Sequence, residues 1–177
     1  MNELVLFVDD EPNILSALSR QFRDEAFTTV TASDGIAALG MLAAMPIAVM
    51  VSDNMMPGMS GIELLGQAKA ASPDTVRILL TGHADLNAAI RAINSGEVYK
   101  FITKPWDPDG LRAIILDALE KHRMTASLRS ADEAMLKSLA QTIELKDRYT
   151  RGHCDRVAEY ADRIAQAYGL SVEPAAV

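Results

Sequence analysis

The sequence predicts an α/β protein with a doubly wound, five-stranded parallel sheet and a C-terminal helical extension. Through about the first 120 residues, short apolar runs of strand length alternate with longer stretches of helical periodicity, which is the pattern of repeated βα units around a buried parallel sheet. The composition then changes. No Gly or Pro occurs from Leu111 to Arg151, and Ala, Leu, Lys, Arg and Glu are abundant there. This favours one long helix, or two helices joined end to end.

The strands are predicted from short apolar runs at Leu4–Val8, Phe27–Thr31, Ile47–Ser52, Val76–Leu80 and Val98–Ile102. The helices between them are predicted at residues 12–24, 34–44, 61–71 and 85–95, and a fifth begins near Asp107. Pro12 suits a first helical turn, where the missing N–H is not needed. In the long C-terminal segment, His122 and Thr125 interrupt the apolar stripe, so the sequence leaves open whether it forms a single unbroken coiled coil.

Composition excludes several classes of protein. Of the 177 residues, 49% are hydrophobic and 23% charged, which is typical of a soluble globular domain with a short appendage. No apolar run is long enough to span a membrane, and the start of the chain lacks the basic region of a secretory signal. The single cysteine, Cys154, cannot form an intramolecular disulfide, so we expect a reducing cytoplasm.

The charge is unevenly distributed along the chain. Residues 1–122 contain 16 acidic and 9 basic side chains, so the whole net charge of −7 belongs to this part. An acidic domain argues against a nucleic-acid surface and is compatible with cation binding. Residues 123–177 contain 8 side chains of each sign and no basic recognition patch, so we expect no direct binding of nucleic acid there either.

Polar side chains follow the predicted strands where each strand ends. The residues are Asp9 and Asp10 after the first strand, Asp53 after the third, Thr81 after the fourth and Lys104 after the fifth. The carboxyl ends of the strands meet at one edge of such a sheet, so these side chains should converge. Close carboxylates repel one another, and a hard divalent cation such as Mg²⁺ relieves the repulsion. Taken singly, each residue is more often a solvated turn, a helix cap or plain surface; together they favour a site. That site suits phosphoryl transfer, with Asp53 as the nucleophile.

These motifs together resemble two-component receiver domains, which have a flavodoxin-like fold. The resemblance covers residues 3 to 122 and is carried by Val8-Asp9-Asp10-Glu11-Pro12, Asp53 with Met56-Pro57-Gly58 and Gly61, Leu80-Thr81-Gly82, and Lys104-Pro105-Trp106. It implies that a histidine kinase or phosphotransfer protein donates a phosphoryl group to Asp53.

The resemblance also assigns roles to the other residues. Asp10, Asp53 and the backbone carbonyl of Met55 would bind Mg²⁺ directly, while Asp9 would act largely through water. Lys104 would pair with the phosphoryl group, Thr81 would hydrogen-bond to it, and Phe101 would be the aromatic switch residue. The Lys104–Pro105 bond would be cis. Receivers commonly dimerise through the face formed by the fourth helix, fifth strand and fifth helix, so we expect a homodimer.

Residues 138–170 resemble the opening of an HD-GYP domain, a family of metal-dependent cyclic di-GMP phosphodiesterases. The resemblance rests on Lys146-Asp147-Arg148-Tyr149-Thr150-Arg151-Gly152-His153-Cys154-Asp155-Arg156-Val157 and the helical pattern that follows. It implies that His153 is the first ligand of a centre of two transition-metal ions in a full-length protein. By itself, a histidine at a helix start is usually structural or on the surface. The other motifs of that family do not occur before Val177, so we expect a truncated chain that does not hydrolyse cyclic di-GMP.

The sequence thus predicts a receiver domain over residues 1–122, a helical linker over 123–137 and a fragment of an HD-GYP-like domain over 138–177. The leading hypothesis is a response regulator that controls a cyclic di-GMP phosphodiesterase. An alternative is a receiver that acts as an adaptor or phosphate sink through dimerisation. A third is a phosphatase of the haloacid dehalogenase type, but that family places its nucleophile after the first strand and a second Asp two positions later. Here Glu11 stands two residues after Asp9.

Overall fold

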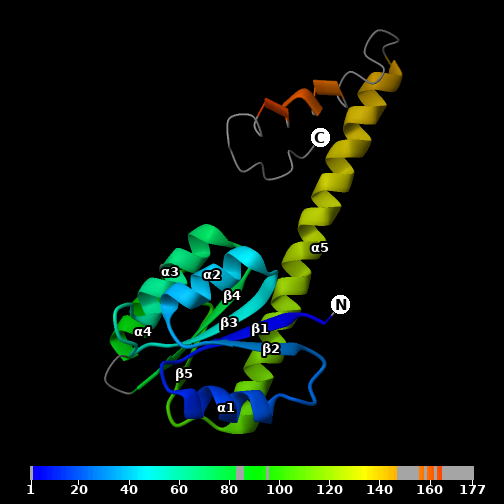
Figure 1. The fold of residues 1–177 in the computed structure, drawn as a ribbon. Helices are drawn as coiled ribbons and strands as arrows, with labels where there is room; N and C mark the ends of the chain where they lie inside the picture. The colour runs from blue at the N-terminus through cyan, green and yellow to red at the C-terminus, as the bar shows by residue number, and fades with distance from the viewer. Residues whose placement is uncertain are drawn as a thin grey trace. The chain divides into compact units, whose positions relative to one another are not determined.

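The computed structural model describes residues 2–82, 86–94, 96–146, 156–157, 159–161 and 163–164. The chain divides into two units, Met1–Met124 and Thr125–Val177. Strands and helices alternate along the chain (Figure 1): β1 (Leu4–Val8), α1 (Pro12–Gln21), β2 (Thr28–Ala32), α2 (Gly35–Ala44), β3 (Ile47–Asp53), α3 (Gly61–Ala71), β4 (Val76–Thr81), α4 (Leu86–Asn94), β5 (Lys100–Thr103) and α5 (Pro108–Lys146). The last of these, α5, begins in the first unit and continues into the second.

The five strands form one parallel sheet in the order β2-β1-β3-β4-β5. The order reverses direction after β1, which is the arrangement of a doubly wound sheet. The predicted fold class is therefore confirmed. Parallel neighbours also bring the last residues of β1, β3, β4 and β5 to one edge of the sheet, where the predicted site lies.

Two apolar layers cover the faces of the sheet. One contains Phe7, Val49, Ile78 and buried side chains of α5 such as Ile115, together with Leu18 of α1. The other is formed with side chains of α2, α3 and α4. Because both faces are covered, β3 is buried at all seven positions. This burial explains why the strand reads as a continuous apolar run instead of an alternating pattern.

Local signals set the starts of the helices. Ser60 and Glu63 form a reciprocal capping box at the start of α3, and the Asp34 side chain accepts the Ala37 N–H at the start of α2. Pro12 occupies the first turn of α1, as predicted. The prediction for the fifth strand was wrong at its start, because β5 begins at Lys100. The N–H groups of Glu97 and Val98 both donate to the carbonyl of Ala92 and so complete the end of α4.

The predicted long C-terminal helix is confirmed, because α5 spans 39 residues. In the first unit, α5 buries Leu111, Ile115 and Ala118 in the core, and Arg112 and Arg123 form ion pairs with Glu25 and Glu3. In the second unit, large apolar side chains of α5 stay exposed: Leu128 67%, Met135 64%, Leu136 47% and Leu139 50%. Among the described helices, none is both long and apolar enough to cross a membrane.

Candidate phosphoacceptor site

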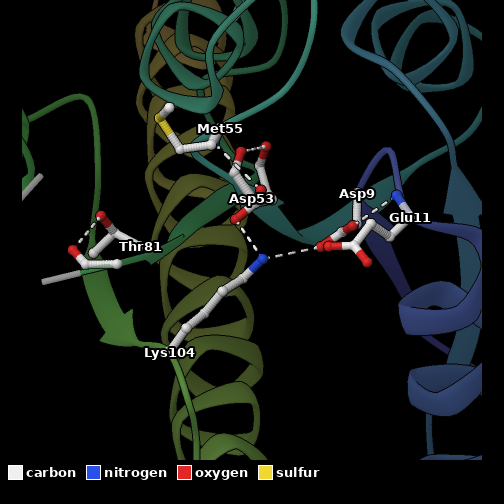
Figure 2. A network of polar contacts seen from close by, with 8 residues as sticks. Asp9, Glu11, Asp53, Met55, Thr81 and Lys104 are labelled. Carbon is white, nitrogen blue, oxygen red and sulfur yellow. Dashed lines mark hydrogen bonds and ion pairs between the residues drawn. The ribbon is translucent and has the colours of Figure 1, made fainter. Parts of the chain in front are cut away.

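Lys104 links the two acidic strand ends at the carboxyl edge of the sheet (Figure 2). Its Nζ lies 2.7 Å from Asp53 Oδ1 and 3.3 Å from Asp9 Oδ2. The three residues follow or end β5, β3 and β1, so the sheet topology brings together side chains that are 95 positions apart at the extremes. The convergence that the sequence predicted for these three residues is therefore present.

Asp9 is held in place by the turn that leads into α1. Its Oδ1 accepts the Glu11 N–H at 2.9 Å, and its own N–H donates to the Ala32 carbonyl of β2 at 3.3 Å. Only 1% of Asp9 is exposed. This burial raises the pKa of the Asp9 carboxyl, although the Glu11 N–H and the Lys104 ammonium both act to lower it.

Asp53 is fixed by the backbone around it. Its Oδ2 accepts the Met55 N–H at 3.3 Å, and the Ser52 hydroxyl donates to its carbonyl oxygen at 2.8 Å. The next residue, Asn54, donates its N–H to the Leu80 carbonyl and accepts the Gly61 N–H. These bonds join the end of β3 to β4 and to the start of α3. The backbone that carries the Asp53 carboxylate is therefore held by hydrogen bonds on both sides.

Lys104 is held from its own strand end. Its N–H donates to the Thr81 carbonyl at 2.8 Å, and the predicted cis Lys104–Pro105 bond is confirmed. Burial lowers the pKa of the Lys104 ammonium, but the ion pairs with Asp53 and Asp9 outweigh it, so the net pKa lies above its ordinary value. Lys104 is therefore a fixed positive charge between two carboxylates.

Among the described residues, the side chains of the other predicted site residues do not join this network, although the backbones of Met55 and Thr81 contact Asp53 and Lys104. Thr81 is fully buried at the end of β4, but its hydroxyl donates to the Gly82 carbonyl at 3.2 Å and not to Asp53 or Lys104 (Figure 2). Phe101 is partly buried against the second apolar layer. Asp10 is exposed, as is the Met55 side chain. His153 lies outside the described residues.

Sequence reasoning passed over Asn54. The residue is 6% exposed, and its Oδ1 has no hydrogen-bond partner. Nothing in an isolated Asn after a strand distinguishes a buried amide from a surface one, since asparagine is mostly exposed in proteins. The sequence therefore held no signal that could have identified it.

The carboxylates fit a magnesium ion in number and kind. Within the described part of the chain, no three acidic, His or Cys side chains form a ready metal site. Two carboxylates do meet, because Asp9 and Asp53 contact the same ammonium. Mg²⁺ usually takes one or two carboxylates and keeps its other positions for water and phosphate oxygens. Asp53 with either neighbouring carboxylate, the buried Asp9 or the exposed Asp10 that follows it, satisfies that requirement in number.

Comparison with known proteins gives a consistent family. The model of the response regulator receiver domain matches residues 5–116. The hydrogenase transcriptional regulatory protein HoxA of Cupriavidus necator is 32% identical over 95% of this chain and 38% of its own length. The C4-dicarboxylate transport transcriptional regulatory protein DctD of Rhizobium meliloti is 36% identical over 76% of this chain and 30% of its own. The chain thus spans less than two fifths of these curated relatives.

Solved structures agree with the family. The adenylate cyclase from Rhodopirellula baltica has a TM-score of 0.72 at 32% identity, covering 74% of this chain and 97% of that one. The signal receiver domain of an HD domain-containing protein from Pseudomonas fluorescens has a TM-score of 0.66 at 35% identity, covering 70% and 99%. In each case nearly the whole of the known structure is matched by about three quarters of this chain or slightly less.

Proposed function

The chain belongs to the response regulator receiver domain family, and we propose that Asp53 is the residue that accepts the phosphoryl group. The ion pair of 2.7 Å between Lys104 and Asp53 carries this proposal. It places a fixed positive charge beside the one acidic side chain that ends the central strand. A receiver domain implies a histidine kinase or phosphotransfer protein as the donor.

The proposed reaction moves a phosphoryl group from a histidine nitrogen of the donor to a carboxylate oxygen of Asp53. The phosphorus–nitrogen bond breaks as the phosphorus–oxygen bond forms, and the histidine keeps the electron pair. The protein mainly positions groups and neutralises charge in such a transfer. Lys104 contributes one positive charge, and Asp9 helps to hold that charge at the site.

Mg²⁺ is the metal that receiver domains bind, and the residues here fit it. We assign direct contacts to Asp10, Asp53 and the backbone carbonyl of Met55, with Asp9 acting through water. When bound, the ion would neutralise negative charge on the phosphoryl oxygens. Asp10 would have to turn toward Asp53 for this, which its exposed position allows.

Thr81 and Phe101 are the proposed switch. The Thr81 hydroxyl now donates to the Gly82 carbonyl, and a phosphoryl group on Asp53 would offer it charged oxygens as better acceptors. That contact exists only after phosphorylation, so it can bias a two-state surface. Phe101, partly buried on the neighbouring strand, would move inward as Thr81 shifts.

Intact mass spectrometry tests the acceptor. Incubation with Mg²⁺ and acetyl phosphate should add one phosphate to the wild type and none to Asp53→Asn. Asp24→Asn, in the exposed turn after α1, is the matched control and should be modified like the wild type. Equal modification of Asp53→Asn and the wild type would refute the assignment.

For the output we propose a cyclic di-GMP phosphodiesterase in the full-length protein. The motif around His153 and the likeness to the receiver of an HD domain-containing protein support it. A transcription-regulating output is the second candidate, because HoxA matches 95% of this chain. Assays of the full-length protein with Mn²⁺ or Fe²⁺ separate the two, since turnover lost in His153→Ala supports only the phosphodiesterase.

We further propose that α5 pairs with a second copy of the chain. Leu128, Met135 and Leu139 leave half or more of their surface exposed on one helix. A helix with an uncovered apolar stripe gains stability when a partner helix buries it. The pairing also serves the alternative function, an adaptor or phosphate sink that acts through dimerisation.

A further inference from the structure

Lys104 has a third neighbour besides its two carboxylates. Its Nζ lies 5.9 Å from the centre of the Trp106 ring. A cation at up to about 6 Å over an aromatic face is attracted by the negative potential of that face, and tryptophan gives the strongest attraction. Trp106 is also the only tryptophan in the chain.

The Trp106 ring is itself held firmly. It is partly buried and packs against the apolar layer that contains Leu111 and Ile115. The next residue, Asp107, directly precedes α5. Its side chain accepts the Gly110 N–H at 2.8 Å, and its carbonyl accepts the Leu111 N–H at 2.9 Å. The indole is therefore anchored to the core from a point two residues beyond Lys104.

A third contact helps the two ion pairs to hold Lys104, because a lysine side chain is flexible in itself. An ammonium on a four-carbon stem is strongly hydrated and loses much rotamer freedom when it is held in one place. Here 26% of the side chain remains exposed, and the Asp9 contact is the longer of the two ion pairs. Water can therefore compete for the ammonium on its open side.

We propose that Trp106 is a positioning residue that holds Lys104 over the acceptor site through the face of its indole ring. The inference rests on the proposed role of Asp53 as phosphoacceptor. A third carboxylate would hold the ammonium more tightly but would also compete with the phosphoryl oxygens for it. The ring carries no net charge, so it restricts the ammonium while leaving it free to pair with the incoming group.

Two substitutions separate positioning from simple core packing. Trp106→Phe keeps an aromatic face, whereas Trp106→Leu keeps apolar bulk without one. With acetyl phosphate and saturating Mg²⁺, Trp106→Leu should be phosphorylated about two- to fivefold more slowly than Trp106→Phe, as expected for an exposed cation–π contact. In a Lys104→Met background the two should react at the same rate, because the cation is gone. Equal rates in the Lys104 protein, or an unchanged ratio in the Lys104→Met background, would overturn the proposal.

The fluorescence of Trp106 gives a readout that does not depend on either variant folding well. Adding Mg²⁺ and beryllofluoride, a mimic of the phosphoryl group, should draw Lys104 toward the mimic and change the Trp106 emission of the wild type. The emission of Lys104→Met should stay the same. No change in the wild type, or the same change in Lys104→Met, argues against the contact. A wild type that takes up no phosphate from acetyl phosphate would instead defeat the acceptor assignment.

Discussion

Replacing Gly61 by alanine should distort the backbone of Asp53, the proposed phosphoacceptor, and of Asn54. A Cβ at this position would lie 2.8 Å from the Asp53 carbonyl carbon and 2.9 Å from the Asn54 Cα, and closer still to the Asp53 carbonyl oxygen. Bringing the 2.8 Å approach to ordinary contact at 3.4 Å already requires a backbone movement of about 0.6 Å, and the closer carbonyl oxygen requires more. Hydrogen bonds from Asn54 to Leu80 and from Gly61 to Asn54 resist that movement.

The expected cost is at the upper end of the range for overpacking, about 3 kcal/mol of unfolding free energy. With a urea slope of about 2 kcal/mol/M, the midpoint should fall by roughly 1.5 M. The matched control is Gly40→Ala in the interior of α2, where a Cβ meets nothing within 4 Å. That change should raise stability by about 0.5–1 kcal/mol.

Urea unfolding by circular dichroism measures both variants of this pair. Gly61→Ala should also be phosphorylated more slowly by acetyl phosphate, since the carbonyl that must move belongs to Asp53. Equal midpoints for Gly61→Ala and Gly40→Ala would show that the loop yields freely. The claim that the hydrogen bonds of Asn54 and Gly61 resist backbone movement would then be wrong.

Three further predictions concern the surface of the protein. The pKa of Asp117 is lowered, chiefly by the hydrogen bond from the Lys100 ammonium and then by that from the Tyr99 hydroxyl. Its contribution to stability is therefore present above the unfolded pKa and is lost as pH falls through the folded pKa. Asp117→Asn should lower stability at neutral pH by no more than about 1 kcal/mol, and a gap that persists in acid would contradict this. Met55 is exposed beside Asp53, and its side chain offers no good hydrogen bond to orient a hydrolytic water. Met55→Asn should therefore shorten the lifetime of the phosphorylated state. Equal lifetimes of the variant and the wild type, followed by intact mass, would count against this prediction. If α5 pairs with a second copy of the chain, light scattering should show the mass of a dimer. A monomer at high concentration would rule out the pairing.

The fold could be predicted from the sequence, because burial on both faces of the sheet leaves strands with continuous apolar runs. The residues at which the strands begin and end were harder to predict. Val98 is 3% exposed and looks like the start of a strand, yet its N–H closes the end of α4 at Ala92. Which carbonyl an N–H meets depends on how the chain turns in space, and an apolar pattern does not record that. The long α5 was predicted because the absence of Gly and Pro is itself a local property.

The candidate site also has features that the sequence predicts and others that it does not. The topology of a doubly wound sheet requires the ends of β1, β3 and β5 to meet, so Asp9, Asp53 and Lys104 could be brought together from sequence alone. The two unequal distances of the Lys104 ammonium, 2.7 Å to Asp53 and 3.3 Å to Asp9, could not be predicted. The burial of the Asn54 amide and the contact of Lys104 with the Trp106 ring could not be predicted either. These depend on side-chain packing between elements distant in sequence.

If Thr81 responds to phosphorylation of Asp53, as we propose, its contacts indicate which movement it would make. Its hydroxyl donates to the Gly82 carbonyl at 3.2 Å, beyond the usual 2.5–3.0 Å of an O–H···O bond. Its carbonyl accepts the Lys104 N–H at 2.8 Å within the sheet. The weak bond belongs to the side chain and the strong one to the backbone, so the strand can stay in register while the hydroxyl turns. A charge-assisted bond to a phosphoryl oxygen is roughly twice as strong as a neutral one, which is enough to replace the present contact. If Thr81 is the switch residue, as we propose, we expect the first step to be a rotation of its side chain, with the β4–β5 pairing kept intact.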